Sequence, residues 1–265
     1  MVIAHSVNQT GQEHDLVDHL KSTAKMAKVF ADKFDAGLFG YWLGLVHDIG
    51  KTQDAFQEYL KKPEGKKKVD HSSAGAVFAA NKIWDYLAFP IAGHHGGLAN
   101  AASLKDRLHK KNDDPKIQEA IKTAFTVLPG VDSVKPIYNR LPLHLKKETQ
   151  LELFIRLLFS ALVDADFLDT ENHFNPDKSE LRSPSVALSE LWNKFEANQN
   201  LLSQGKSGLI NGLRKEIYEA CCQAGTLQPG VFRLTVPTGG GKTRSGMAFA
   251  LKHALKYNMD RVIVA

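Results

Sequence analysis

The feature that most constrains this chain is the stretch GLVHDIGK, residues 44–51, where His47, Asp48 and Lys51 interrupt an apolar segment. Ionisable side chains in such a segment are costly to bury unless another group pairs with them. The chain has 11 histidines, and five share apolar or glycine-rich surroundings: His19, His47, His71, His94 and His95. We therefore expect distant parts of the sequence to supply the partners of the buried groups.

Carboxylates accompany these histidines. Asp48 and Asp70 each adjoin one, and Asp164 and Asp166 lie in a long apolar segment. Imidazole and carboxylate ligands suit Mn, Fe, Co, Ni or Zn. Neighbouring side chains on a helix point about 100° apart, so a His-Asp pair can serve two metals. A pair of ions about 3.5–4 Å apart can activate water and neutralise a phosphodiester. We expect such a centre to compensate His47 and Asp48 inside the core.

Helical periodicity dominates the first part of the chain, and no strand-like alternation is sustained before about residue 230. We expect helices over residues 16–34, 40–50, 104–111, 115–128 and 147–171, with one more inside 70–88 that Ser72 or Ser73 caps. A further polar-flanked helix and a linker at 203–208 follow. The sequence predicts a mainly α fold, with an all-α domain over residues 1–203.

Residues 204–265 have a different pattern. A helix over 209–225 is followed by the β-branched segment GVFRLTV at 230–236, a glycine loop, a helix over 244–257 and the apolar segment RVIVA. Strand, glycine loop, helix and strand in this order are typical of the opening of an α/β domain. We therefore expect a second domain, incomplete in this sequence, over residues 204–265.

The His and Asp motifs together resemble the HD phosphohydrolase superfamily. The motifs are LVDHL around His19, HDIGK, DHSSAGA, GHHGG and LVDADFLDTE. They are most similar to the HD nuclease domain of the nuclease–helicase recruited in type I CRISPR interference, over about residues 1–200. AHS at 4–6 and FLDTE at 167–171 favour that branch over nucleotide phosphohydrolases. The resemblance implies an all-α, metal-dependent endonuclease that cuts single-stranded DNA, recruited by the RNA-guided CRISPR surveillance complex in antiviral defence.

The resemblance also implies a role for individual residues. The ligands of one metal would be His19, His47, Asp48 and Asp166. Those of the second would be His71, His94 and His95, with Asp48 as the bridge. Lys51 would lie near the scissile phosphate and stabilise charge in the transition state. The implied cofactors are two divalent transition-metal ions, of which Mn, Fe, Co and Ni fit the ligands.

Several positions stay open. Asp164 and Asp166 lie about 200° apart on a helix, and each continues an apolar stripe, so periodicity does not choose between them. The Ala165-Asp166 step of the superfamily favours Asp166, and Asp164 would then orient a ligand histidine. His5 either lines the cleft or bonds to backbone. The remaining histidines sit among charges or turns and are expected to face solvent: His14, His109, His144, His173 and His253.

The segment VPTGGGKT at 236–243 resembles a Walker A loop at the first motif of a superfamily 2 helicase, although Val236 replaces the usual first glycine. The resemblance implies that Gly239, Gly240 and Gly241 cradle phosphates, Lys242 reaches the β and γ phosphates, and Thr243 binds Mg²⁺. No Walker B motif follows before residue 265. We therefore expect an N-terminal piece of a longer protein, with ATP and Mg used for helicase activity only in the full length.

Charge and composition add weaker constraints. The net charge of +5 and pI near 9.0 are compatible with a polyanionic partner. The basic runs at 61–68 and 107–111 are either solvated loops or guides for a nucleic-acid backbone. The adjacent Cys221 and Cys222 exclude a disulfide framework, and the sequence has no signal peptide or apolar run long enough to span a membrane. A cytoplasmic location is the simplest interpretation.

Two alternatives to the nuclease hypothesis remain. An HD phosphohydrolase of free nucleotides or cyclic dinucleotides would use the same metal chemistry. A catalytically inactive nucleic-acid-binding module would carry a degenerate metal site, and the filled ligand positions count against it.

Overall fold

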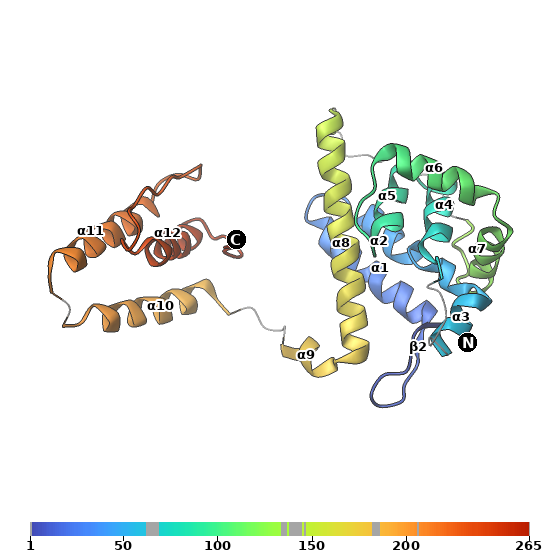
Figure 1. Ribbon diagram of the computed structural model, residues 1–265, viewed down its shortest axis with the longest axis horizontal. Coiled ribbons are helices and arrows are strands. Elements are labelled where there is room, and N and C mark those ends of the chain that lie inside the picture. The colour runs from blue at the N-terminus through green and yellow to red at the C-terminus, as the bar shows by residue number, and fades with distance from the viewer. Residues whose placement is uncertain are drawn as a thin grey trace. The chain divides into compact units, whose positions relative to one another are not determined.

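The computed structural model describes residues 2–61, 69–133, 137, 145, 147–181, 186–205 and 207–264. The chain divides into two compact units, residues 1–181 and 182–265, shown in blue to yellow and in orange to red in Figure 1. Within the described residues, no helix combines the length and apolarity needed to cross a membrane.

The first unit is helical apart from one short hairpin. The hairpin pairs β1 (Ile3–His5) with β2 (His14–Asp15) in antiparallel fashion. The helices that follow are α1 (Leu16–Asp32), α2 (Gly37–Val46), η1 (Ile49–Thr52), α3 (Asp54–Lys61), α4 (Ser72–Lys82), η2 (Asp85–Leu87), α5 (Ala88–Gly93), α6 (Ala101–Asn112), α7 (Pro115–Val127), α8 (Glu148–Phe174) and α9 (Pro176–Leu181).

Helices α1 and α2 form a tightly packed pair at the centre of this unit. The Asp15 carboxylate caps α1 by accepting hydrogen bonds from the backbone N–H groups of Val17 and Asp18. Gly44 of α2 faces the backbone of α1 so closely that a Cβ there would overlap Ala24. The absence of a side chain at Gly44 therefore allows the two helices to approach at the point that leads into His47.

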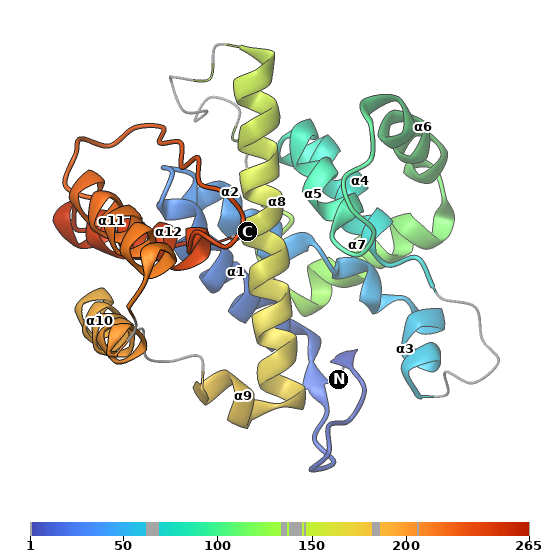
Figure 2. The ribbon, with the colours of Figure 1, turned by 60° about the vertical axis from the view of Figure 1, so that its left-hand side comes forward.

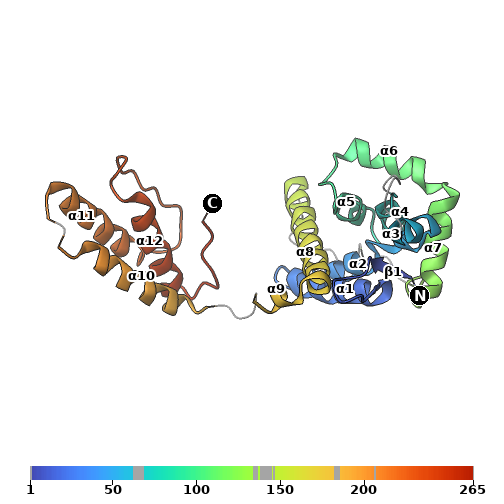
Figure 3. The ribbon, with the colours of Figure 1, turned by 60° about the horizontal axis from the view of Figure 1, so that its bottom comes forward.

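The long helix α8 closes the core from the other side. It packs along α1, α2 and α5, and Figures 2 and 3 show it crossing these helices. Phe154, Leu158 and Leu162 of α8 are buried in the same hydrophobic core as Phe39 and Leu43 of α2. This packing brings the second half of α8 against the hairpin and the start of α1.

The helices predicted for the first unit are present, with two local corrections, and α3 and α9 form where no helix was predicted. The helix expected over 40–50 ends at Val46, and His47 and Asp48 form a turn before the 3₁₀ turn η1. The helix expected after residue 70 begins at Ser72, yet its cap is the Asp70 carboxylate, which accepts from the backbone N–H and Oγ of Ser73. An aspartate side chain before the first turn reaches these donors, whereas Ser72 and Ser73 already lie inside the helix.

The second unit contains α10 (Leu188–Ser203), α11 (Leu209–Ala224) and α12 (Lys242–Lys256). Helix α12 packs against both α10 and α11. Helix α10 therefore belongs to this compact unit, although the predicted domain boundary at residue 203 places it in the first domain. The assignment of the two domains to nuclease and helicase parts stays a prediction.

The prediction of strands at 230–236 and 261–265 was wrong for the residues that the structure describes. Residues 231–237 and 261–264 have no strand pairing. Strands of a parallel sheet are held by neighbouring strands, and these two segments do not pair with each other or with another described segment. Their β-branched composition alone therefore does not produce a sheet.

Candidate metal centre

The carboxylate of Asp48 occupies the centre of the candidate site and is fully buried. It follows His47 in the turn between α2 and η1. Its two oxygens face different partners. Oδ2 lies 3.3 Å from His47 Nε2 and 3.5 Å from His19 Nε2. Oδ1 lies 3.2 Å from His94 Nε2 and 3.6 Å from His71 Nε2. Asp48 is therefore placed as a bridge between two groups of imidazoles.

The first group gathers side chains from three segments. His19 comes from α1, His47 and Asp48 from the turn after α2, and Asp166 from α8. Asp166 Oδ1 lies 3.5 Å from His19 Nε2 and 3.6 Å from His47 Nε2. Asp164 is exposed to solvent. Of the two carboxylates that periodicity left open, the structure thus brings Asp166 to the site and not Asp164.

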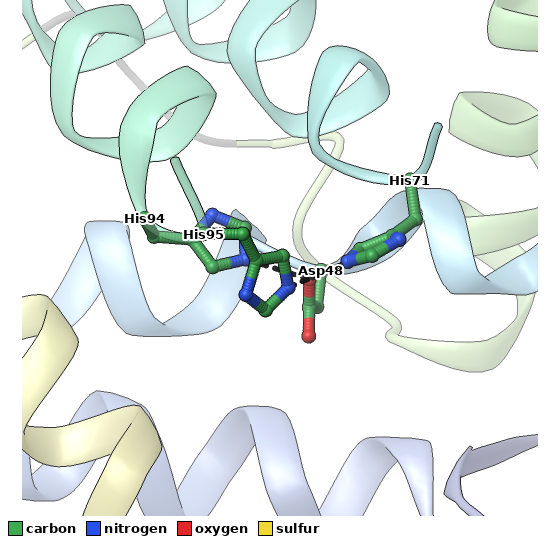
Figure 4. Close-up of side chains that lie close together, drawn as sticks. All are labelled: Asp48, His71, His94 and His95. Carbon is green, nitrogen blue, oxygen red and sulfur yellow. Dashed lines mark hydrogen bonds and ion pairs between the residues drawn. The ribbon is translucent and has the colours of Figure 1, made fainter. Parts of the chain in front are cut away.

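The second group combines Asp48 with His71, His94 and His95. Figure 4 shows Asp48 between His71, which precedes α4, and the pair that follows α5. The Nε2 atoms of His71 and His95 are 2.7 Å apart. His95 is exposed, whereas His71 and His94 are buried. The site therefore meets solvent beside His95.

Each buried histidine has its Nδ1 atom occupied by an acceptor. His47 donates its Nδ1–H to the carbonyl of Gly44 at 2.8 Å. His94 donates its Nδ1–H to the carbonyl of Ile91 at 2.7 Å. His71 donates in the same way to Val69 O at 3.1 Å. A proton on Nδ1 leaves Nε2 of a neutral ring with a lone pair. These backbone contacts therefore direct lone pairs at Asp48, as metal-ligating histidines require.

The unpaired atoms of the site provide a direct test of fit to a metal. Four buried atoms have neither a hydrogen-bond donor nor an ammonium partner: His19 Nε2, His47 Nε2, His94 Nε2 and Asp48 Oδ1. The other oxygen, Asp48 Oδ2, lies beside the Lys51 ammonium. These atoms lie in two groups, with one ligand atom of each residue in a group within 4.8 Å of the others. Buried acceptors without donors are costly. A cation on each side of Asp48 would satisfy the four atoms, so the residues fit two metal ions.

The charges of the site are strongly coupled. Burial raises the pKa of Asp48, but Lys51 and His47 outweigh it and hold that pKa well below its usual range. Burial disfavours a charged His47, yet the negative charges of Asp48 and Asp166 raise the His47 pKa to about 10. Burial lowers the pKa of His95 to about 3. Because metal ligation needs a neutral ring, metal binding would release the proton from His47.

Lys51 projects from η1 into the first group. It is 3% exposed, and its Nζ lies 2.7 Å from Asp48 Oδ2 and 3.3 Å from His5 Nε2. An ammonium held among carboxylates at a two-metal site can donate to an oxygen of a bound phosphate. This burial does not fit a lysine at the protein surface.

Sequence reasoning missed Asp169, which orients His19. Asp169 is 7% exposed, and its Oδ2 accepts from His19 Nδ1 at 2.7 Å. The role that the sequence analysis gave to Asp164 therefore belongs to Asp169. Asp169 lies three residues after Asp166, and positions three apart share a helix face. That spacing was the signal that could have identified it.

Three histidines predicted to face solvent are partly or fully buried. His14 and His173 stack with ring centroids 4.5 Å apart and half-buried rings. His253 is 8% exposed, because α12 packs on α11 and its Nδ1 donates to Gly225 O. His109 is exposed, as predicted, and His144 lies outside the described residues. His5, which was left open, contacts His14, Lys51 and Thr170 through its ring.

Arg107 is a second residue whose role sequence reasoning missed. The run 107–111 lies on α6, in agreement with the helix predicted over 104–111 and not with a solvated loop. The guanidinium donates to Ser72 Oγ, Ser73 Oγ and the carbonyl of Ala92, and it pairs with Asp70. It thus ties the start of α4 to the end of α5, the two places that present His71 and His94. The other basic run lies mostly outside the described residues, in its part over 62–68.

The glycine loop of the second unit precedes a helix, as predicted. Gly239 and Gly241 have φ values of +85° and +83°, in the left-handed region that favours glycine. Helix α12 begins at Lys242, and both Lys242 and Thr243 are exposed. Gly240 lies so close to Val236 that a Cβ there would overlap its side chain.

A helical unit with His and Asp side chains converging on a bridging carboxylate defines a metal-dependent hydrolase of the HD class. The family model described as "Cas3, HD domain" matches residues 4–152. The chain therefore belongs to the Cas3 HD domain family, whose members are metal-binding nucleases of CRISPR systems. Asp166 lies beyond the matched residues.

Two further comparisons add little to this assignment. A crystal structure of T. fusca Cas3 with ADP matches with a TM-score of 0.46 and 18% identity, covering 96% of this chain and 34% of that chain. The chain thus spans about a third of the length of that protein. No curated protein matches the chain.

Proposed function

We propose that the first unit is a two-metal nuclease that hydrolyses phosphodiester bonds in single-stranded DNA. The observation that carries the proposal is the Asp48 carboxylate, whose two oxygens face separate groups of buried Nε2 atoms. His19, His47, Asp48 and Asp166 would hold one metal, and Asp48, His71, His94 and His95 the other. Two such ions, when bound, supply Lewis acidity that activates water and neutralises the phosphate.

The roles of the protein groups follow from their positions. The backbone acceptors behind His47, His71 and His94 keep the Nε2 atoms directed at Asp48. Lys51 donates to a non-bridging oxygen of the scissile phosphate as charge develops there. The substrate approaches beside the exposed ring of His95. Single-stranded DNA is the substrate that the motif resemblance implies, and the net charge of +5 is compatible with a polyanionic substrate.

A matrix of metals and substrates tests this proposal. The purified protein is treated with chelator, reloaded with Mn, Fe(II), Co, Ni or Mg, and assayed on labelled single- and double-stranded DNA, deoxynucleotides and cyclic dinucleotides. We expect cutting of single strands with the transition metals above that with Mg, because imidazole-rich sites favour them. Asp48→Ala should abolish it. Hydrolysis of free nucleotides with intact DNA would instead support a nucleotide phosphohydrolase, and a protein without bound metal would support an inactive binding module.

We also propose that the glycine loop binds ATP with Mg in a longer, helicase-containing protein. The left-handed Gly239 and Gly241 and the helix that begins at Lys242 support a phosphate cradle. Partners would be single-stranded DNA and the CRISPR surveillance complex, which implies a cytoplasmic location. Titration with a fluorescent ATP analogue and Mg tests the loop. We expect binding without hydrolysis by this chain and its loss in Lys242→Ala.

A further inference from the structure

A second set of polar side chains lies behind the first group of the metal centre. His5 comes from β1, His14 from β2, and Asp169 and Thr170 from the end of α8. They connect Lys51 to His19 in an unbroken series of short contacts. Lys51 Nζ lies 3.3 Å from His5 Nε2, and His5 Nδ1 lies 3.0 Å from His14 Nδ1. His14 Nε2 lies 3.3 Å from Asp169 Oδ2, which is 2.7 Å from His19 Nδ1.

The charged groups at the two ends of the series determine independently which ring nitrogens donate and which accept. An ammonium only donates, so His5 Nε2 accepts from Lys51 and the His5 proton lies on Nδ1. The Thr170 hydroxyl, 3.4 Å away, can donate to the same Nε2. His14 Nε2 faces the Asp169 carboxylate at 3.3 Å, an electrostatic contact that favours a proton on Nε2 and leaves His14 Nδ1 with a lone pair. His5 Nδ1–H then donates to His14 Nδ1.

We propose that His5 and His14 are positioning residues, which hold Lys51 and His19 in place through a chain of hydrogen bonds that includes one electrostatic contact, between His14 and Asp169. The proposal rests on the proposed function, because it assumes that Lys51 acts on the substrate. The chain restrains Lys51 through His5 and contacts, through His14, the oxygen of Asp169 that orients His19. It therefore couples the hairpin at residues 3–15 to both the charge-stabilising ammonium and a metal ligand.

A third metal ion at His5, His14 and His19 is the competing interpretation, since these residues also offer atoms within 4.8 Å of one another. The contacts argue against it. His19 Nδ1 is engaged by Asp169, the Lys51 ammonium occupies His5 Nε2, and His5 Nδ1 faces His14 Nδ1 at hydrogen-bond distance. The ring nitrogens therefore match hydrogen bonds better than ligation.

Long-range ¹H–¹⁵N correlation spectra of the zinc-loaded protein test the chain without an activity assay. We expect neutral His5 protonated on Nδ1 and neutral His14 protonated on Nε2, with signals assigned through His5→Phe and His14→Phe. A proton on His5 Nε2 or on His14 Nδ1 would overturn the proposal. So would three zinc ions per wild-type chain that fall to two in His14→Phe.

Kinetics then test the role of the chain. His5→Phe should lower kcat about 10–100-fold, the usual cost of losing a residue that orients a ligand or catalytic group. The same substitution in a Lys51→Ala background should change kcat less than threefold, because its effect passes through Lys51. His173→Phe is the matched control: it keeps the ring stacked on His14 but lies outside the chain. We expect His173→Phe to retain wild-type kcat.

Equal losses from His5→Phe with and without Lys51 would contradict the positioning role, as would an equal loss in His173→Phe. A wild-type protein that cleaves no DNA would instead refute the proposed function. The tautomers in the zinc-loaded protein would still decide whether the chain exists, so the two failures are distinguishable.

Discussion

Gly50 lies directly against the backbone of His71, so that a Cβ on Gly50 would overlap the His71 carbonyl oxygen. This contact joins the segment that supplies His47 and Asp48 to the segment that supplies the second imidazole group. The 3₁₀ turn η1 makes it possible, because the chain tightens immediately after Asp48. The distance between the two groups is thus set by a backbone approach that only glycine permits.

Replacement of Gly50 tests this relationship. In Gly50→Ala the new methyl group must displace the backbone at His71, and we expect a loss of about 1–3 kcal/mol of stability, typical of overpacking. In this variant, the second group, which includes His71, should lose its metal before the first group does. Denaturant unfolding and elemental analysis measure both effects. Gly96→Ala is the control, since a Cβ there meets no atom within 4 Å; equal damage in the two variants would contradict the close-contact explanation.

Metal stoichiometry should separate the two groups. We expect about one ion per chain in Asp166→Ala and in His94→Ala, because each removes a ligand of one group only, and less than one in Asp48→Ala. Elemental analysis after dialysis gives the count. Asp164→Ala, two residues from Asp166 but exposed, should retain both ions. A loss of metal in Asp164→Ala with full retention in Asp166→Ala would reverse the ligand assignment.

Arg107 should affect the affinity of the second site for its metal, although Arg107 is not a ligand. Arg107→Lys cannot form the planar fork that reaches Ser72, Ser73 and Ala92 together. We expect 10–100-fold weaker binding at the second site, as for other residues that orient ligands, with the first site unchanged. Metal titration monitored by absorption of bound Co(II) distinguishes the sites. Lys110→Ala, an exposed neighbour on α6, is the control.

The pairing of Asp70 predicts a pH dependence of stability. Burial raises the pKa of Asp70, but hydrogen bonds from Ser73 and the charge of Arg107 outweigh it and lower that pKa below 3.8. A carboxylate with a lowered folded-state pKa stabilises the fold above its unfolded pKa and loses that contribution as pH falls through the folded value. Asp70→Asn should therefore be less stable than wild type at pH 6, with the difference shrinking below about pH 4.

Chemical denaturation of metal-free protein across pH 2.5–7 measures this difference. Asp106→Asn, which alters an exposed carboxylate next to Arg107, is the control and should leave the pH profile unchanged. A constant difference between wild type and Asp70→Asn over the whole range would count against a lowered Asp70 pKa.

Removal of metal should destabilise the first unit. The buried Nε2 atoms and Asp48 Oδ1 lose their cationic partners when the ions leave, and only Lys51 remains beside Asp48 Oδ2. Any ligand that binds only the folded state stabilises it, by about 2.7 kcal/mol at 100 times its Kd. We expect chelator to lower Tm of the wild type by several degrees and Mn or Co to restore it. The Tm of Asp48→Ala should respond much less to either treatment.

The sequence predicted the helices of the first unit and the set of residues that meet at Asp48, because those signals are local. Apolar periodicity marks each helix, and a histidine in an apolar segment is conspicuous wherever it folds. Asp169, His5 and His14 could not be paired in this way. Their contacts join the hairpin to the end of α8, about 150 positions later in the chain, and depend on how α8 packs. In the strand predictions the local signal was present but the long-range partner was not: β-branched residues at 230–236 suit a sheet, but they pair with no described segment.

One consequence follows from the composition of α8. This single helix contributes Asp166, Asp169 and Thr170, spaced along one side within little more than a turn. The Asp166 member of the first group, the Asp169 contact to His19 and the Thr170 contact to His5 thus lie on one helix, while His71, His94 and His95 of the second group come from separate segments between residues 69 and 95. A lateral shift of α8 would therefore withdraw Asp166 from the first group and break both supporting contacts at once, while His71, His94 and His95 would stay in place.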